Sequence, residues 1–508
     1  VMALTQDQRR LVVGICVVVA AFTMVSAAYN YILEPMLDGL GASEGQTSLL
    51  RQLPSMATLA VVFLGGVLGD RFGDRRMLWI SAVFFTLGSL LVAIAPVFGI
   101  AALGLVVQSI AMSAGSVISL GFLSARISDP AGRASAFSVF AIVGPFIYLV
   151  VPILTGALVD NRTWRLVPAL WAIGGLAMFA AVRRLLPQDG PPRARGELIT
   201  PLLAGLVLTA AVQAINAAAD EPLLSFEVLL RAGLVVAGIV ALVVLFRRAE
   251  TPSLSLAALR TGGMLVLLAV VLLVPFANLW FYATMGYQYV FGLTTLQTAL
   301  AMAPAQVGAI VGAVITRKLL TRLGIRRAGT ITLLAFAATL LPMWLINAGS
   351  PLWVPILVVS LYAAAFTGAS IPLTNAIMNT APAGEEGSAS AFRSASGHLG
   401  AALGVVFTSA VITTVVTTSL TGLLDSQGLA SDQARGIVDE IMDGASSENI
   451  SSQYSIPVSD VDTMSTDVGL AMIDGWHSVA GTGAVVALAC AGIFTVALRR
   501  QEHAPGVR

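Results

Sequence analysis

The feature that most constrains this chain is the recurrence of long apolar runs, each separated from the next by a short polar or charged stretch. A run of about 20 apolar residues is long enough to cross a bilayer as a helix. Of the 508 residues, 57% are hydrophobic and 11% are charged, whereas soluble domains carry about 25% charged residues. The sequence therefore predicts an all-α polytopic membrane protein with fourteen transmembrane helices, near residues 11–33, 47–69, 77–97, 98–123, 134–158, 165–183, 198–219, 223–246, 262–291, 295–316, 328–347, 352–374, 388–417 and 476–498.

Basic residues divide unequally between the two sides of the predicted membrane. Loops assigned to one side hold pairs such as Arg183 and Arg184, or Arg326 and Arg327, whereas loops on the other side hold few basic residues, among them Arg162. Cytoplasmic loops are the ones that carry an excess of arginine and lysine. Both termini are therefore predicted to be cytoplasmic, as an even number of helices requires, in a multi-pass protein of the cell membrane.

Motifs of other function classes do not occur in the sequence. There is no phosphate-binding G-x-x-x-x-G-K-[ST] tract, no His/Cys cluster with metal-ligand spacing and no nucleophile–base arrangement. The two cysteines, Cys16 and Cys490, lie inside apolar runs and predict no disulfide. We therefore expect no enzyme activity, no cofactor, no metal and no nucleic-acid partner.

A glycine-rich stretch, Gly65–Arg76 (G-G-V-L-G-D-R-F-G-D-R-R), joins the second and third runs. Its glycines would let another helix approach the backbone closely, and its arginines would hold the turn on the cytoplasmic side. Arg322–Arg327 (R-L-G-I-R-R) echoes the end of this stretch, which indicates two related halves. The turn predicts a cytoplasmic gate made of Asp70, Arg71, Gly73, Arg75 and Arg76.

The two related tracts predict a 6 + 2 + 6 division of the helices. Residues 1–184 would form an N-terminal six-helix bundle, residues 185–260 a linker with two inserted helices, and residues 261–508 a C-terminal six-helix bundle. Within the last, residues 418–475 form a long acidic extracellular loop with helical spacing at 431–445 and 464–473. This loop is predicted to be either a small amphipathic hairpin packed on the outer mouth or a flexible segment, and it is a candidate docking site for an extracytoplasmic partner.

Four stretches carry a resemblance to a known family. Gly65–Arg76 resembles G-x-L-[AG]-D-R-x-G-[RK]-[RK], with Asp74 in place of a basic residue. Val151–Gly156 keeps the proline and the last glycine of G-P-x-x-G-G, and Tyr287–Pro304 and Gly387–Val405 are similar to patterns in helices nine, ten and thirteen. On these residues the chain resembles the fourteen-helix drug:proton antiporter branch (EmrB/QacA type) of the major facilitator superfamily. The resemblance implies that family's fold and export of drug-like or lipid-like solutes.

Two positions depart from that branch, and both concern proton coupling. The resemblance places Ser26 where helix one usually has an aspartate, and Leu105 where helix four usually has an arginine. A buried carboxylate with an arginine partner is a usual means of coupling export to proton entry. The remaining candidates are Glu34, which could instead form a structural ion pair with Arg51 at the outer mouth, and His398, which could instead be a neutral packing histidine.

Polar residues inside the predicted spans are candidates for a substrate cavity near the midplane, although each could instead form a helix–helix hydrogen bond. These residues are Asn30, Gln108, Asn278, Tyr282, Gln288, Asn375, Asn379 and Arg393.

Three functions are compatible with these patterns. The first is export of an amphipathic small molecule or lipid by alternating access, coupled to protons or uncoupled, and the sparse intramembrane charge favours a neutral or apolar-bodied substrate. Loss of both usual coupling residues makes a lipid or glycolipid flippase the alternative. The long acidic loop makes a non-transporting membrane scaffold the third hypothesis.

Overall fold

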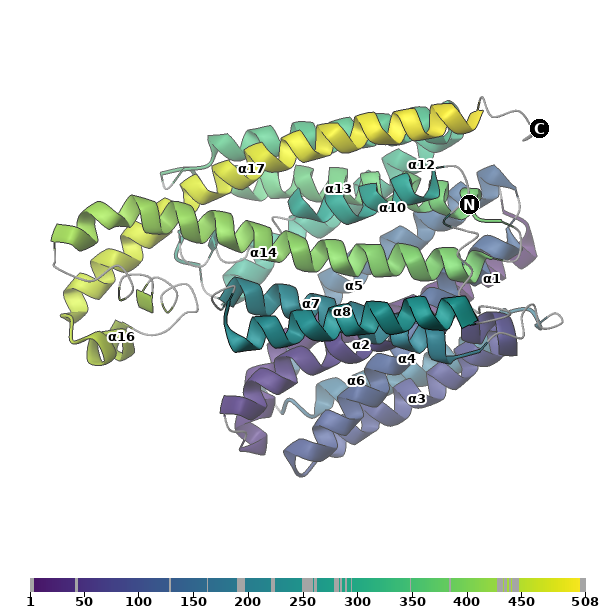
Figure 1. Cartoon of the computed structure of the whole chain (residues 1–508), viewed down its shortest axis with the longest axis horizontal. Coiled ribbons are helices and arrows are strands. Elements are labelled where there is room, and N and C mark those ends of the chain that lie inside the picture. Colours follow the sequence, from purple (N-terminus) through teal and green to yellow (C-terminus); the bar gives the residue numbers. More distant parts are fainter. Residues whose placement is uncertain are drawn as a thin grey trace.

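Helices make up nearly all of the structure, and most of them run roughly along the long axis of the molecule (Figure 1). The computed structural model describes residues 4–41, 44–127, 129–161, 163–189, 197–220, 224–248, 259, 263–277, 283, 286–287, 290–293, 295–347, 349–382, 385–426, 433, 436–437, 440 and 447–502. The elements are α1 (Gln6–Leu40), α2 (Glu44–Phe72), α3 (Asp74–Ile94), α4 (Phe98–Arg126), α5 (Pro130–Asn161), α6 (Leu166–Leu185), α7 (Ile199–Asp220), α8 (Phe226–Arg248), α10 (Met264–Leu273), η1 (Val274–Ala277), α12 (Thr295–Leu340), η2 (Leu341–Leu345), α13 (Trp353–Thr380), α14 (Glu386–Ser426), α16 (Ser447–Tyr454) and α17 (Val458–Glu502).

Twelve helices in the described part of the chain are long and apolar enough to cross a membrane. The longest, Gln297–Leu345, contains Gly324 at φ 73° and ψ 171°, where one helical segment ends and the next begins. A shorter apolar segment, Met264–Ala277, becomes a 3-10 helix near Pro275, because proline cannot donate a backbone hydrogen bond. The all-α polytopic fold is confirmed, whereas the count of fourteen and the 6 + 2 + 6 division stay predictions.

The two arginine-rich tracts adopt a similar turn. Gly73 has φ 92° between α2 and α3, and Gly324 has φ 73° between the two segments of α12. Glycine enters this left-handed region at little cost. The echo between R-F-G-D-R-R and R-L-G-I-R-R is therefore one of backbone geometry as well as sequence.

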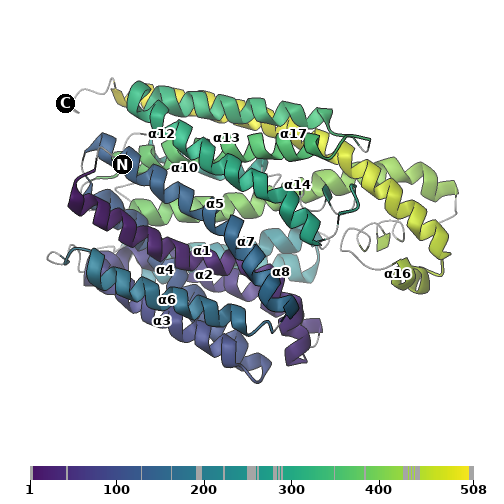
Figure 2. The same cartoon turned by 180° about the vertical axis from the view of Figure 1, so that it is seen from behind.

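The two ends of the helix bundle differ in charge. The first turn of α1 and the last turns of α17 lie at the same end (Figures 1 and 2). The end of α6 lies there too, because Gly14 of α1 lies against Leu185 and Leu186. The α2–α3 turn joins it, because the Arg75 guanidinium donates to the carbonyl oxygens of Val182 (3.3 Å) and Arg183 (2.7 Å). We call this end, which the sequence assigns to the cytoplasm, the arginine-rich end.

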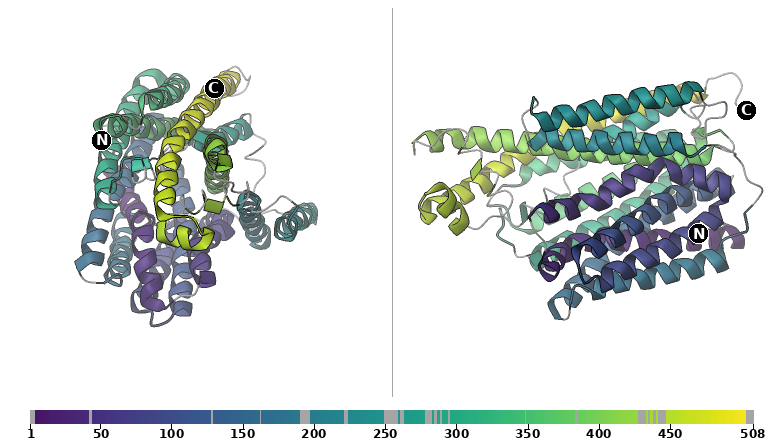
Figure 3. Two further views of the ribbon diagram at one scale, coloured as in Figure 1. Left: turned by 90° about the vertical axis from the view of Figure 1, so that its left-hand side faces the viewer. Right: turned by 60° about the horizontal axis from the view of Figure 1, so that its bottom comes forward.

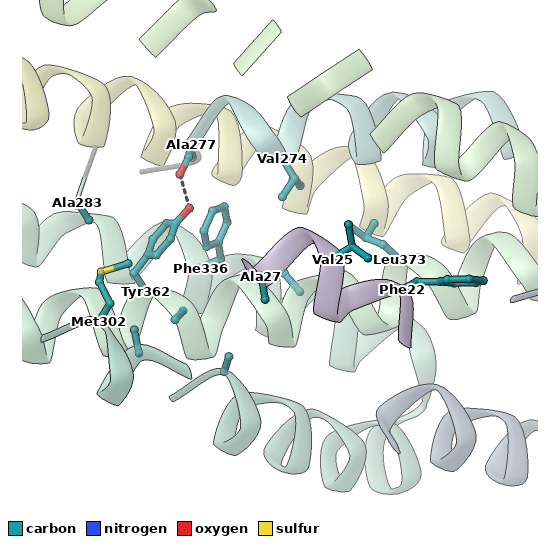
Figure 4. Packing of buried hydrophobic residues seen from close by; sticks show 14 of the residues in the cluster. Phe22, Val25, Ala27, Val274, Ala277, Ala283, Met302, Phe336, Tyr362 and Leu373 are labelled. Atoms are coloured by element: carbon teal, nitrogen blue, oxygen red, sulfur yellow. Dashed lines mark hydrogen bonds between the residues drawn. The ribbon is translucent and has the colours of Figure 1, made fainter. Parts of the chain in front are cut away.

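The central core joins helices from early and late parts of the chain. Phe22, Val25 and Ala27 of α1 belong to the same buried cluster as Leu373 of α13 (Figure 4). In that cluster the Tyr362 hydroxyl donates to the Ala277 carbonyl at 2.8 Å, which satisfies a backbone group where η1 departs from α-helical geometry. The core therefore includes side chains of both α1 and α13.

The helices α7 and α8 lie at the edge of the bundle (Figure 3). On α7, Gln213 donates to Gln52 of α2 at 2.6 Å, and Gly205 lies against the carbonyl of Ala60. The outer helix α8 packs on α7 and leaves apolar side chains such as Val236 exposed. In a bilayer those side chains face lipid.

The acidic segment 418–475 is helical where it is described. The helices α14 and α17 continue beyond the predicted spans, to Ser426 and from Val458, and project past the other helices together with α16 (Figure 1). Ile450, Val461 and Val468 are buried and form a small core between α16 and α17. Residues 447–454 and 458–475 are helical, whereas the choice between a hairpin and a flexible segment for the whole loop stays a prediction. Most of 431–445 lies outside the described residues.

Candidate functional site

Each glycine of the Gly65–Arg76 stretch meets a different neighbour at the end of α2. A Cβ on Gly65 would lie 2.9 Å from Ala114 Cα of α4, and a Cβ on Gly66 would lie 2.5 Å from the Gly387 carbonyl oxygen of α14. Both distances are too short for any side chain. The absence of side chains therefore lets α2 touch the backbones of α4 and α14, as the sequence predicts.

The α2–α14 contact brings Asp70 to the first turn of α14. A Cβ on Gly387 would lie 2.7 Å from Asp70 Oδ2, and the Asp70 residue is 9% exposed. A carboxylate at a helix N-terminus is stabilised by the positive end of the helix dipole. Beside it, Ser390 Oγ of α14 donates to the Val117 carbonyl of α4 at 2.8 Å. The early helices α2 and α4 are thus closed onto α14.

A second contact closes the same end on the far side of the bundle. Arg133 of α5 donates to the carbonyls of Ser124 (3.1 Å) and Ile127 (2.9 Å), and its Nη1 donates to Asn379 Oδ1 of α13. Asn379 in turn donates to Asn375 Oδ1 at 3.3 Å. We use the term seal for three contacts: Gly66 with Gly387, Ser390 with Val117, and Arg133 with Asn379. Asn375 and Asn379 lie at or beside this seal, and their predicted cavity role stays a prediction.

The other predicted gate residues build the α2–α3 turn. Gly73 takes its positive φ at the start of α3, and the Asp189 carboxylate accepts the backbone N–H groups of Arg75 (2.8 Å) and Arg76 (3.0 Å). Arg71 lies over the Phe72 ring at 5.2 Å. The N-terminal cap supplied by Asp189 was missed from the sequence, because nothing local marks a carboxylate 114 residues away as a helix cap.

Replacing Asp189 with alanine is expected to destabilise the folded protein by about 1 kcal/mol, because two N–H groups at the start of α3 lose their acceptor. The midpoint of thermal unfolding of the purified protein measures this effect. Gln188→Ala is the matched control, because Gln188 accepts from Arg126 through its backbone carbonyl, which the substitution keeps. Equal midpoints for the two variants would contradict the capping role.

One stripe of α14 changes from buried to exposed with distance from the arginine-rich end. Gly387, Ala391, Ser394, His398 and Val405 follow one another at spacings of three, four and seven residues, which keeps them on one helix face. Gly387 and Ala391 are buried, Ser394 is half-buried, and His398 and Val405 are exposed. The face that closes onto α2 and α4 at the seal is therefore open at the level of His398.

Polar groups of α1 and α5 are also exposed inside their spans. Ser26 and Asn30 lie one turn apart on α1, both exposed, and Tyr148 of α5 lies beside Ser26. Ser26 is thus a small neutral hydroxyl that solvent-sized molecules can reach. Asn30 stays a cavity candidate.

Gln108 does not lie on this open surface. It is fully buried between α3 and α4, where its Nε2 donates to Ser89 Oγ at 2.6 Å. Gly88 allows the approach, because a Cβ there would lie 2.9 Å from Gln108 Cβ. This contact fits the alternative of a helix–helix hydrogen bond, and the cavity role of Gln108 stays a prediction.

Arg393 is half-buried in α14 and donates from Nε to Thr374 Oγ1 of α13 at 3.0 Å. His398, five residues further along, has no hydrogen-bond partner among the described residues. The roles predicted for five other residues remain predictions. Asn278, Tyr282 and Gln288 lie outside the described residues, as do the side chains of Glu34 and Arg51.

An open groove separates α5 from α12 and α13 on the flank of the molecule. Its volume is about 720 Å³, and its lining is almost wholly apolar. Leu149 contributes from α5, Leu300 and Pro304 from α12, and Trp353 from α13. Leu300 and Trp353 lie near the first turns of their helices, so the groove lies toward the end opposite the arginine-rich end.

Comparison with known proteins identifies relatives over most of the chain. The profile of the Major Facilitator Superfamily matches residues 13–405. The methyl viologen resistance protein SmvA of Salmonella typhimurium is 25% identical over 409 residues, which cover 78% of this chain and 81% of that protein. The multidrug resistance protein Stp of Mycobacterium tuberculosis is 24% identical, covering 70% and 67%. The puromycin resistance protein pur8 of Streptomyces alboniger is 27% identical, covering 64% and 66%.

Solved structures share the fold at low sequence identity. The human organic anion transporter MFSD10 aligns with a TM-score of 0.58 at 14% identity, over 95% of this chain and 100% of that one. The proton:xylose symporter XylE aligns with a TM-score of 0.57 at 15% identity, over 92% and 94%. At these identities the likeness concerns the fold alone.

Proposed function

Because this chain belongs to the major facilitator superfamily and is a transporter and not an enzyme, we propose that it exports amphipathic, drug-like or lipid-like solutes across the cell membrane by alternating access. The observation that carries the proposal is the contrast along α14. Gly387 and Ala391 are closed onto α2 and α4, whereas His398 and Val405 on the same face are exposed. The relatives named for drug resistance support export as the direction.

The contrast corresponds to an outward-facing state of such a cycle. If the arginine-rich end is cytoplasmic, the seal blocks the cytoplasmic side while the face at His398 is reachable from outside. Breaking the seal and closing the opposite end would present the same face to the cytoplasm. Asp70 and the glycines around it then act as the cytoplasmic gate.

Proton coupling, if it operates, is assigned to His398 or Glu34. His398 is an exposed imidazole inside a spanning helix, with no hydrogen bond to any residue in the described ranges. A histidine changes charge near neutral pH, so a proton gradient can act on it. Ser26 and Leu105 cannot do so, because neither side chain titrates in that range.

Transport in proteoliposomes with an imposed pH gradient tests this assignment. The probes are fluorescent amphiphiles with one alkyl chain and a carboxylate, a neutral amide or a trimethylammonium head. We expect gradient-driven movement that falls about tenfold or more in His398→Ala, or in Glu34→Gln if that residue carries the proton. His477→Ala is the matched control, because His477 Nε2 is hydrogen-bonded at 3.0 Å to the carbonyl oxygen of Ile346, in the loop between η2 and α13. Movement that ignores the gradient in every protein would contradict proton coupling.

A lipid flippase is the second candidate, and the apolar groove of about 720 Å³ favours it. A groove open on the flank can admit an acyl chain from the surrounding bilayer. Gradient-independent movement of a fluorescent two-chain phospholipid between leaflets would support this candidate. The scaffold hypothesis predicts movement of no probe at all.

A further inference from the structure

Arg393 is a cation inside a spanning helix, only partly satisfied by the protein. It lies seven residues after Glu386, about 10 Å along α14 from the start of that helix. Its Nε donates to Thr374 Oγ1, and no other hydrogen bond or ion pair joins it to any described residue. A guanidinium carries five N–H donors, and no described residue accepts from the other four.

The helices around Arg393 offer no carboxylate at its level. The helices α4, α10, η1 and α13 contain no Asp or Glu along their whole lengths. Glu386, the acid before it in α14, interacts with Arg133 of the seal, and Asp70 lies at the first turn. The acidic residues of α2, α7 and α17 lie in their terminal segments or beyond the membrane span. An intramembrane arginine is costly unless it is paired or faces water, which marks Arg393 as a functional group.

A second basic side chain lies just beyond Arg393. His398 is five residues further along α14, about 7.5 Å by helical rise, and is exposed. The seal lies on the other side of Arg393, at Gly387 and Ser390. Between the buried residue Ala391 and the exposed residue His398, α14 therefore carries basic side chains and no acidic one.

We propose that this place binds the anionic head of an amphiphile, a carboxylate or a phosphate ester, and that Arg393 is its principal ligand. The planar guanidinium matches both head groups with paired hydrogen bonds. Exposed apolar side chains further along α14, such as Val405, suit the apolar body. Binding of the anion does not require the proposed function; only the export of the bound solute rests on it. It replaces the neutral substrate that the sequence favours by an anionic one.

Binding to the full-length protein in zwitterionic nanodiscs tests the site without requiring transport. The probes are the three single-chain amphiphiles with carboxylate, amide or trimethylammonium heads. We expect wild type to bind the carboxylate at least tenfold more tightly than the trimethylammonium probe. Arg393→Gln, which can still donate to Thr374, should weaken carboxylate binding at least tenfold and change amide binding less than twofold. Arg393→Lys should retain part of the preference, and the exposed Arg247→Gln should retain all of it.

Other outcomes would overturn the anion site. Equal binding of the three heads to wild type would do so, as would an equal loss for carboxylate and amide in Arg393→Gln, because that pattern indicates a structural role. Competition by phosphatidylglycerol, against phosphatidylcholine as control, shows whether a lipid head reaches the site. The transport assay separates the two proposals. If the protein binds the carboxylate probe preferentially but moves no probe, export is contradicted and the anion site is not. If transport is the same for all three heads and in Arg393→Gln, the anion site is contradicted and export is not.

Discussion

Replacing Gly66 with leucine is expected to abolish transport and to leave the arginine-rich end open. A Cβ at this position would lie 2.5 Å from the Gly387 carbonyl oxygen and 2.7 Å from its carbon, so α2 and α14 cannot make their present contact. The obstacle is backbone, which cannot rotate away as a side chain can. Because the steric cost falls on the sealed state only, the population shifts toward states in which the two helices are apart.

Labelling of a cysteine at position 390 measures this opening. Ser390 is fully buried at the seal, and Cys16 and Cys490 are replaced by alanine so that the new thiol is unique. We expect a membrane-impermeant maleimide to react with Ser390→Cys at least tenfold faster when Gly66→Leu is also present. Gly233→Leu on α8 is the control, because a Cβ there meets nothing within 4 Å. Unchanged labelling together with normal transport would remove Gly66 from the gate.

The local part of this gate could be predicted from the sequence, and its partners could not. Glycines followed by Asp70 and arginines indicate a close-packed turn at the membrane surface, and Gly73 has the positive φ that such a turn requires. The partner of Gly66, however, is Gly387, more than 300 residues later. A single sequence encodes which face of a helix is bare of side chains, but not which backbone will lie against it.

The polar candidates divide for a related reason. Gln108 and His398 both read as polar groups inside apolar runs, yet Gln108 is buried against Ser89 and His398 is exposed. Hydropathy indicates how deep a residue lies in the membrane. Whether its side chain faces another helix or an open surface depends on tertiary packing. Arg133 likewise shows a direction that hydropathy does not give, because it bridges α5 to α13.

Replacing Gly312 with leucine is expected to prevent folding of the later helices. Gly308 and Gly312 lie one turn apart on α12, and a Cβ on either would overlap a carbonyl of α13, that of Ser360 or Ala364 respectively. Small residues at this spacing let two helix backbones touch along a seam in a membrane. Because both obstacles are backbone carbonyls one turn apart, a side chain at Gly312 must push the helices apart along the whole seam.

The yield of monodisperse protein after solubilisation measures this effect, together with the thermal midpoint. We expect little or no folded Gly312→Leu protein and a lowered midpoint for Gly312→Ala, since overpacking even by small groups costs about 1–3 kcal/mol. Gly144→Leu on α5 is the matched control, because a Cβ there has no neighbour within 4 Å. It should fold with wild-type yield. If Gly312→Leu also did so, close α12–α13 contact would not be needed for the fold. If Gly312→Leu fails to fold while Gly66→Leu folds normally, the two helix contacts differ in kind. The α12–α13 contact would be required for folding, whereas the α2–α14 contact would be one that opens during each transport cycle.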